Sequence, residues 1–480
     1  MKTGSDNVAE VSATGALAGL SAAEMLEGFR SKSFDPVDVV EDTIVMLSAA
    51  DAACNIMVSD LFESARRQAQ ESAAAWNEGT ARPMEGVPVS IKDLVFVEGA
   101  PCKGGAPSLA NYVAETDAHV VTKLREAGAV LTCKTTTCES GYKLTADSPV
   151  TGITRNPWDT SRTSGGSSGG AAAGVAAGAG PIAIGTDGVG SIRVPSSFCG
   201  VVGLKPTFGY VSRAPGFFPP SWGSLAHTGP IARTVSDIAT TLEVISGYDM
   251  RDAASLFGAP DVEASEKPLR IAVSADLGYT PVDPAVRQAF EDACAAILSG
   301  PFDFSAAKLE LAPDVFESVL KPIAYSEQAG SVGTRGDSDF AGSDPEFRAV
   351  IDEGRKFSGV DYVEATHRRS KLRGQYVQLF QNADVLLTPT LPVTAFAAGT
   401  LGVSEIDGQA VDGHLGWSPF TWPINLTGLP AATVPCGFCP DGLPIGLQII
   451  APWGREDIVL KIASYFESVK PWLGVRPSLS

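Results

Sequence analysis

The amino-acid sequence predicts an α/β fold, in which helical layers pack against a β-sheet. A helix, a glycine and a buried strand follow one another in "TDAHVVTKLREAGAVLTCKT" (116–135), with Asp117 expected to cap the helix. A strand, "LRIAVSADL" (269–277), also precedes a helix, "DPAVRQAFEDACAAIL" (283–298). Alternation of strand and helix patterns is typical of this class. No internal repeat or interdomain linker interrupts the 480 residues, which favours one large domain, 1–480.

The first 80 residues are expected to form two or three amphipathic helices. Ser21 followed by Glu24 has the spacing of a capping box. Asp35 followed by Pro36 is typical of an N-cap residue and a proline at the first helical position. Two helix starts are therefore predicted close to the beginning of the chain.

A core rich in strands is expected over residues 84–250 and again near the C-terminus. The Val- and Ile-rich stretch "EGVPVSIKDLVFV" (85–97) predicts its first strand. Residues 300–370 have the least regular pattern and are interpreted as a variable, loop-rich segment that shapes substrate binding. Further strands are predicted at "ADVLLTPTLP" (383–392), "AATVPCGF" (431–438) and "PIGLQIIAP" (444–452).

The composition argues against several classes of partner. Hydrophobic residues make up 44% and charged residues 19%, which is typical of a globular protein with a large core. A net charge of −19 and a pI near 4.7 argue against binding to nucleic acid or to an anionic membrane, because a polyanion would be repelled. The N-terminus lacks the apolar segment of a signal peptide, and no stretch offers the roughly 18 apolar residues of a membrane helix. A cytoplasmic protein is expected.

The eight cysteines show no regular spacing. Cys436 and Cys439 form a single C-x-x-C with no second pair, so the pattern does not predict a zinc site. Free thiols in a reducing compartment are expected instead.

The run "SRTSGGSSGG" (161–170) has the glycine and serine content of a flexible linker. It continues, however, into "AAAGVAAGAGPIAIG" (171–185), whose residues are small and apolar. Such residues suit a buried helix followed by a strand better than a solvated coil. The run is therefore interpreted as part of the core.

A nucleophile elbow is a weak explanation of this run, although G-x-S-x-G occurs twice, centred on Ser167 and on Ser168. The elbow requires a buried strand just before it, whereas the preceding "RNPWDTSRT" (155–163) is polar and rich in turn residues. It also requires a histidine base. No local pattern recommends any of the downstream candidates, which are His227, His367 and His414.

Four separate motifs together resemble the amidase signature family. They are "GVPVSIKD" (86–93), "GGSSGG" (165–170), "GTDGVGSIRVPSSFCGVVGLKPT" (185–207) and "NLTGLPAATVPCGF" (425–438). The likeness extends from about residue 20 to residue 470 and is weakest over 300–370. It implies a mixed β-sheet of many strands surrounded by helices. It also implies a hydrolase of carbonyl–nitrogen bonds that needs no metal or organic cofactor.

The resemblance assigns catalytic roles to three residues. Lys92 matches the family's lysine base, Ser167 the bridging serine that follows a cis peptide bond, and Ser191 the nucleophile. The chemistry supports these roles, because a serine hydroxyl needs a base and a lysine is a base only when burial keeps it neutral. Ser167 has both a donor and an acceptor, so it can pass a proton between the other two.

The segment "TDGVGS" is expected to form the oxyanion hole through the backbone N–H groups of Gly188, Val189, Gly190 and Ser191. Val189 departs from the family pattern D-x-G-G-S. A β-branched residue tolerates positive φ poorly, and its side chain is expected to narrow the pocket and restrict substrate choice. Asp187 and Arg193 also match family positions and are interpreted as a structural ion pair.

A substrate pocket is expected beside the nucleophile, where "SRAPGFFPPSWGSLAHTGPIART" (212–234) is rich in aromatic residues and proline. By position, Phe217, Phe218 and Trp222 are expected to line it. Gly141 lies where family members let their backbone approach the substrate, and its missing side chain leaves room for bulk. A hydrophobic mouth suits an aryl amide or carbamate better than glutamine.

The resulting hypothesis is a free-standing serine amidohydrolase, a monomer or homodimer. It would cleave hydrophobic or aryl amides, or carbamates (urethanes), through an acyl-enzyme intermediate. Two alternatives stay open. One is the amidase subunit of a tRNA-dependent amidotransferase, whose activity depends on protein partners. The other is a histidine-dependent α/β-hydrolase esterase, which would require His227 or His414 for activity.

Overall fold

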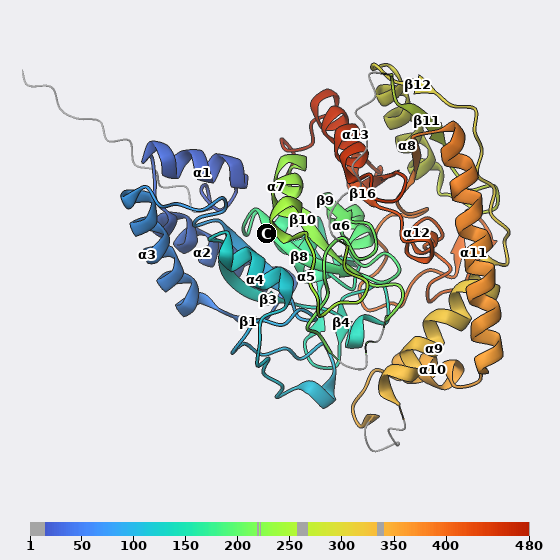
Figure 1. Ribbon diagram of the computed structural model, residues 1–480, viewed down its shortest axis with the longest axis horizontal. Helices are drawn as coiled ribbons and strands as arrows, with labels where there is room; N and C mark the ends of the chain where they lie inside the picture. Colours follow the sequence, from blue (N-terminus) through green and yellow to red (C-terminus); the bar gives the residue numbers. More distant parts are fainter. Residues whose placement is uncertain (1–14, 218–219, 221, 257–266, 334–339, 480) are drawn as a thin grey trace, which may run out of the picture.

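An 11-stranded mixed sheet forms the centre of the computed structural model, with helices around it (Figure 1), which confirms the predicted fold class. The structure describes residues 15–217, 220, 222–256, 267–333 and 340–479. In spatial order the strands of the sheet are β1 (Met57–Asp60), β3 (Val130–Thr135), β2 (Pro88–Lys92), β8 (Ile182–Asp187), β10 (His227–Ala232), β9 (Val202–Lys205), β16 (Ala431–Phe438), β17 (Pro444–Ile450), β13 (Val385–Pro389), β11 (Arg270–Val273) and β12 (Asp303–Phe304).

The direction of the strands places the segments that follow β2 and β8 at the same edge of the sheet. β2 runs parallel to both β3 and β8, whereas β8, β10, β9, β16, β17 and β13 are each antiparallel to their neighbours in that series. β2 ends at Lys92 and its parallel neighbour β8 ends at Asp187. Because parallel strands end on the same side, the chain leaves both strands next to each other, where ligands bind in many α/β folds.

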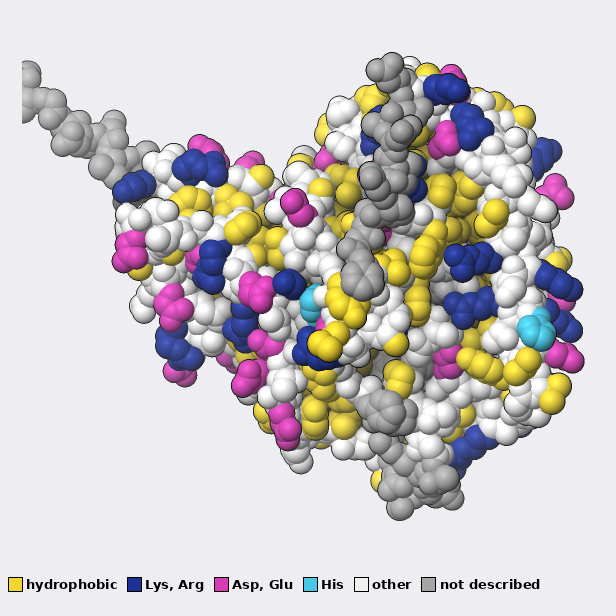
Figure 2. All heavy atoms as spheres, viewed as in Figure 1, with side chains coloured by type: hydrophobic (Ala, Val, Ile, Leu, Met, Phe, Trp, Pro, Cys, Tyr) yellow, Lys and Arg dark blue, Asp and Glu magenta, His cyan; other side chains and the backbone are white. Residues whose placement is uncertain are grey.

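Three helices precede the first central strand, as expected, and lie at the left of Figure 1: α1 (Ala22–Ser31), α2 (Pro36–Cys54) and α3 (Phe62–Glu78). Ser21 forms the predicted capping box with Glu24, and Asp35 caps α2 with Pro36 in its first turn. The short edge strand β1 between α2 and α3 was not expected. Acidic and basic side chains are interspersed over this part of the surface (Figure 2).

The glycine- and serine-rich run is not a linker. It leads into α5 (Gly169–Ala176), a helix whose eight residues are all buried, and then into the central strand β8. The absence of large side chains lets the helix pack closely against its neighbours. A Cβ atom at Gly170, for example, would clash with the carbonyl oxygen of Ile56.

The expected helix cap at Asp117 is wrong. α4 (His119–Glu126) begins one residue later than predicted, and Ala118 is its N-cap. The Asp117 carboxylate instead accepts hydrogen bonds from the backbone N–H of Glu98 and from Arg125 Nε. The Asp117 carboxylate therefore binds groups outside the first turn of α4 and does not cap the helix.

The loop-rich interpretation of residues 300–370 is also wrong, because most of the described part is helical. Asp344 caps α10 with Pro345 in its first turn, and Ser358 forms a capping box with Asp361 at the start of α11. These are the same signals that predicted the N-terminal helices. The segment contains a π-helical turn (Phe316–Leu320), α9 (Lys321–Val332), α10 (Pro345–Gly354) and the start of α11 (Gly359–Asn382), all at the right of Figure 1.

The remaining elements complete the layers around the sheet. The helices are α6 (Arg193–Cys199), α7 (Val235–Ile245), α8 (Pro284–Leu298), α12 (Trp422–Thr427) and α13 (Glu456–Val469), with 3-10 turns at Pro107–Leu109 and Glu139–Gly141. Short two-stranded ribbons join β4 (Asp147–Ser148) to β5 (Gly152–Ile153), β6 (Arg155–Asn156) to β7 (Asp159–Thr163), and β14 (Glu405–Ile406) to β15 (Gln409–Ala410). All eight cysteines are free, and six of them are buried. Within the described residues, no helix has the length and apolarity to span a membrane.

Candidate active site

Lys92, the last residue of β2, lies in a fully buried position at the carboxyl edge of the sheet. Its Nζ atom donates hydrogen bonds to Ser167 Oγ at 2.7 Å, to Ser168 Oγ at 2.9 Å and to Thr186 Oγ1 at 2.9 Å. Burial lowers the pKa of Lys92 to about 7, although the nearby Asp187 carboxylate favours the charged form. Near neutral pH, a large fraction of this lysine is therefore uncharged and able to accept a proton.

The two neighbouring serines differ in the hydrogen bonds that they make. Ser168 Oγ donates to the carbonyl of Thr186 at 3.1 Å and accepts from the Thr186 N–H at 3.2 Å, in addition to its bond with Lys92. Ser167 follows a cis peptide bond from Gly166, and among the described residues its Oγ forms a hydrogen bond only with Lys92. Ser167 therefore keeps a hydroxyl hydrogen to donate, which favours it as the bridging residue.

Ser191 lies in the turn between β8 and α6, and its side chain is buried. Its carbonyl oxygen accepts a hydrogen bond from the Ser168 N–H at 3.1 Å, which joins this turn to the glycine- and serine-rich run. No hydrogen bond connects the Oγ atoms of Ser191 and Ser167 in the described structure. Such catalytic hydrogen bonds are often long in a site without substrate and shorten when substrate binds.

A buried ionic cluster holds the turn that carries Ser191. The Asp187 carboxylate accepts from Arg193 Nε and Nη2, both at 3.0 Å, and from Asn425 Nδ2 at 2.8 Å. Burial alone would raise the pKa of Asp187, but the Arg193 guanidinium holds it well below the usual range. The expected ion pair is thus present, and it ties the turn to α12.

The same carboxylate changes the expected oxyanion hole. The Gly190 N–H donates to Asp187 Oδ1 at 2.7 Å, so it is not available to a substrate oxygen. The N–H groups of Gly188, Val189 and Ser191 have no acceptor among the described residues and stay candidates. Positive φ falls on Gly190, at 137°, and not on Val189. The backbone conflict expected for a β-branched residue therefore does not arise.

Val189 does not narrow the substrate pocket as expected. Its side chain is 1% exposed and belongs to the hydrophobic core. It is not among the residues that line the cavity described below. The branched side chain of Val189 packs in the hydrophobic core, so Val189 contributes to the stability of the turn.

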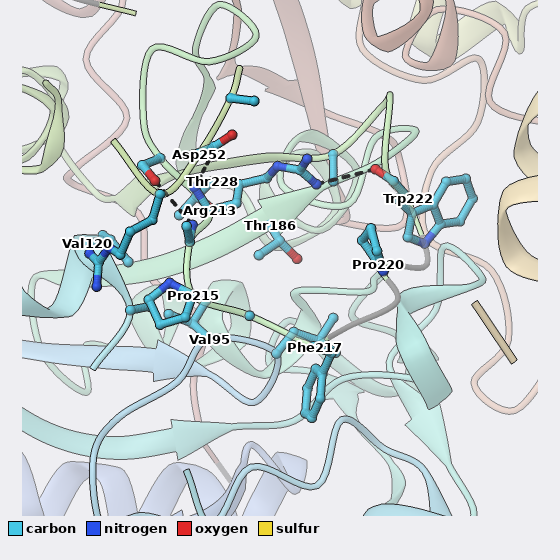
Figure 3. Close-up of a pocket in the computed structure, with 18 residues that line it drawn as sticks. Val95, Val120, Thr186, Arg213, Pro215, Phe217, Pro220, Trp222, Thr228 and Asp252 are labelled. Atoms are coloured by element: carbon cyan, nitrogen blue, oxygen red, sulfur yellow. Dashed lines mark hydrogen bonds between the residues drawn. The ribbon is translucent and has the colours of Figure 1, made fainter. Parts of the chain in front are cut away.

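A cavity of about 430 Å³ opens beside the site (Figure 3). Thr186, which binds Lys92, forms part of its wall, and Phe217 and Trp222 also line it. Phe217 also packs against Phe96 and Tyr112, with ring centroids 4.9 Å and 5.6 Å away. Phe218 lies outside the described residues. Apolar lining is further supplied by Leu94, Val95, Ala118, Val120, Pro215 and Ala226.

Gly141 lies next to Ser167, and its missing side chain does not open space for substrate as expected. Its φ is +66°, and a Cβ atom there would lie 3.1 Å from Leu94 Cδ1 and 3.3 Å from Ser167 Oγ. Its carbonyl accepts a hydrogen bond from Trp222 Nε1 at 3.1 Å. Glycine suits this position because the backbone is left-handed and a Cβ atom would crowd Leu94 and Ser167.

Comparison with known proteins identifies this arrangement. The model of the amidase family matches residues 38–460. The chain belongs to the amidase signature family. An acylamidase of Rhodococcus erythropolis is 37% identical to it, over 96% of this chain and 97% of the relative. One of the subunits of the glutamyl-tRNA(Gln) amidotransferase of Symbiobacterium thermophilum is 33% identical, over 96% of this chain and 99% of the relative. The crystal structure of a bacterial aryl acylamidase of the family superposes with a TM-score of 0.86 at 29% identity, covering 94% of this chain and 96% of that one.

Membership of the amidase signature family agrees with the position of the histidines. No histidine hydrogen-bonds to Ser167, Ser168 or Ser191 among the described residues. His227 Nδ1 lies 3.2 Å from the carbonyl of Asp187, and His414 Nδ1 lies 2.7 Å from the hydroxyl of Tyr325. The structure therefore offers no histidine base for an esterase elbow.

Two contacts of this amidase site were not foreseen in the sequence. Ser168 and Thr186 both accept hydrogen bonds from Lys92, so the lysine has three hydroxyl partners and not one. Ser168 adjoins Ser167, and Thr186 is the penultimate residue of β8. The Thr186 contact depends on the parallel pairing of β2 with β8, which the sequence does not reveal.

A Gly141→Ala variant is expected to lower kcat/KM by about tenfold or more, since displacing Ser167 by a fraction of an ångström disturbs proton transfer. Left-handed backbone also costs about 1–2 kcal/mol once a Cβ is present. Gly79→Ala is the matched control, because Gly79 has φ +73° and an added Cβ would meet no atom within 4 Å. Steady-state kinetics and denaturant unfolding check both variants. Equal activity in the two would show that the Ser167 contact is unimportant.

An Arg193→Met variant is expected to lower the free energy of unfolding by about 3–5 kcal/mol, because it leaves the buried Asp187 carboxylate without its cation. Denaturant unfolding followed by circular dichroism measures the change. Arg66→Met, which breaks an exposed pair with Glu41, is the control and is expected to have a much smaller effect. Similar losses in both variants would contradict the anchoring role of Arg193.

Proposed function

We propose that the chain is a serine amidohydrolase that cleaves amides of hydrophobic or aromatic acids and amines through an acyl-enzyme intermediate, with carbamates as a second substrate class. The observation that carries the proposal is the hydrogen bond of 2.7 Å from buried Lys92 to Ser167. A lysine with a pKa of about 7 and a hydroxyl partner is suited to move protons at neutral pH.

In the first half of the proposed reaction, Ser191 Oγ attacks the carbonyl carbon of the amide. Its proton passes to Ser167 Oγ, while the Ser167 proton passes to neutral Lys92 Nζ. The C–N bond then breaks, and the amine leaves with a proton returned from Lys92 through Ser167. The acyl group stays bound to Ser191.

In the second half, a water molecule attacks the acyl-enzyme and is deprotonated along the same path. The Ser191–acyl bond breaks, Ser191 regains its proton, and the acid is released. In both halves the negative oxygen is stabilised by backbone N–H groups of the turn, for which Gly188, Val189 and Ser191 are the candidates. The ion pair of Asp187 with Arg193 keeps that turn in place.

The substrate class rests on the cavity and on the similar proteins. The cavity is lined mainly by aliphatic and aromatic side chains, including Phe217 and Trp222. Such a lining favours aryl or alkyl groups over the charged amino-acid end of glutamine. The similarity to an acylamidase and to an aryl acylamidase points in the same direction.

The amidase subunit of an amidotransferase is the second candidate, because subunits of glutamyl-tRNA(Gln) amidotransferases are 33% identical over nearly the whole chain. The purified chain alone distinguishes the two. Hydrolysis of 4′-nitroacetanilide and of a phenyl carbamate, without any partner protein, is the expected result. Release of ammonia from glutamine with no turnover of anilides would support the amidotransferase candidate and overturn the proposal.

A further inference from the structure

Arg213 is a cation in the wall of the substrate cavity, and the mechanism above does not use it. It follows β9 in the chain, and its side chain extends across the cavity toward Trp222 (Figure 3). Nη1 donates to the carbonyl of Trp222 at 3.3 Å, and Nη2 donates to the carbonyl of Gly223 at 2.9 Å. A guanidinium carries five N–H donors, so these two bonds leave most of its capacity unused.

In the part of the chain that the structure describes, the charge of Arg213 has no carboxylate partner. Both acceptors are neutral carbonyl groups, and no carboxylate of the described residues forms an ion pair with the guanidinium. Asp252 is nearby, but its Oδ2 atom accepts from the backbone N–H of Arg213. Burial lowers the pKa of Arg213 from its usual value, against the opposing effect of Asp252 and Glu327. A partly desolvated cation of this kind is costly unless an anion reaches it.

Two other arginines, Arg251 and Arg233, are placed differently. Arg251 also lines the cavity, but Asp249 neutralises it at 2.9 Å. Arg233 is buried and bound to carbonyls, but it makes three such bonds and does not line this cavity. Among the described residues, Arg213 thus combines the absence of an ion pair with a position in the wall of the cavity that Thr186 also lines.

We propose that Arg213 binds an anionic group of the substrate, so that the preferred substrate is a hydrophobic or aryl amide that carries a carboxylate. Guanidinium groups bind carboxylates through two parallel N–H···O bonds, which provide both strength and orientation. The same cavity is bounded by Thr186, the hydroxyl partner of Lys92. One molecule can therefore contact the catalytic side and Arg213 together. This inference rests on the proposed amidohydrolase function and narrows its substrate class.

Matched substrate pairs test the inference. In 4-acetamidobenzoate and 4′-methylacetanilide the acid and neutral groups are on the amine side, and in succinanilate and butyranilide they are on the acyl side. The wild-type chain is expected to prefer the acid in one pair. Arg213→Met is expected to lower kcat/KM for that acid by about 10- to 100-fold and for its neutral partner by less than about threefold. Arg213→Lys is expected to retain part of the preference. Arg66→Met, an exposed charge loss on α3, is the control.

Two results would overturn the inference. One is a wild-type enzyme that prefers the neutral member of both pairs. The other is an equal loss for acid and neutral substrates in Arg213→Met, which would mean that Arg213 only braces the Trp222–Gly223 turn.

A binding measurement separates this inference from the proposed function. Titration calorimetry of the four compounds into the Ser191→Ala protein, with and without Arg213→Met, reports on Arg213 without any hydrolysis. Tighter binding of the acid that disappears in Arg213→Met supports the anion site even if no amide is turned over. Equal binding of acid and neutral compounds contradicts it.

Discussion

A Ser191→Ala variant is expected to lose amide hydrolysis by about 10⁴-fold or more while it folds normally. The loss of rate is large because the variant lacks the nucleophile and cannot form the acyl-enzyme. Lys92 and Ser167 then have no hydroxyl to activate. Only substrate binding and the backbone N–H groups would continue to accelerate the reaction. Steady-state hydrolysis of an activated anilide measures the loss.

Ser196→Ala is the matched control for Ser191→Ala. Ser196 is a buried serine in α6, five residues further along the chain, and its hydroxyl has no hydrogen-bond partner among the described residues. Its replacement is expected to change the rate by only a small factor. Full activity in Ser191→Ala, or a loss of similar size in Ser196→Ala, would remove Ser191 from the mechanism.

The rate is expected to rise about tenfold per pH unit below pH 7 and to level off above it. The rate rises with pH because Lys92 is the base. Burial lowers the pKa of Lys92 to about 7, and only the neutral amine accepts the proton that Ser191 releases. Lowering the pH protonates Lys92 and switches the enzyme off. The dependence of kcat/KM on pH, measured with an uncharged substrate, reports the pKa in the free enzyme.

Lys92→Arg provides the control for this pH profile, because a guanidinium stays protonated and cannot act as a base. The variant is expected to be inactive throughout the range. A wild-type rate that falls with rising pH, or one that is flat between about pH 5.5 and 8.5, would contradict the role of neutral Lys92.

Local signals in the sequence predicted local structure well. The capping box at Ser21 and the N-cap at Asp35 need only neighbouring residues, and both form. The same logic would have found α11 from Ser358 and Asp361, had residues 300–370 not been interpreted as loop-rich. Asp117 shows the opposite case, because the distant N–H of Glu98 takes the carboxylate that a local cap would have used.

The candidate triad could be located from motif resemblance, but its surroundings could not. The Gly190 N–H donates a hydrogen bond to the Asp187 carboxylate, and this bond depends on the exact conformation of a four-residue turn. Gly141 lies beside Ser167 although the two are 26 residues apart in the chain, and the hydrogen bond of Trp222 to Gly141 spans 81 residues. No sequence motif marks Arg213, since its significance lies in the lack of an ion pair to its guanidinium among the described residues.

Fluorophosphonate labelling of the purified chain, followed by mass spectrometry of the modified peptide, is the most direct test of the proposed mechanism. The reagent reacts with a serine that an adjacent base activates. A single modified residue, Ser191, is expected, with a labelling rate that rises with pH through about 7 as Lys92 becomes neutral. Modification of Ser167 or Ser168 in its place would contradict the assignment of nucleophile and bridge.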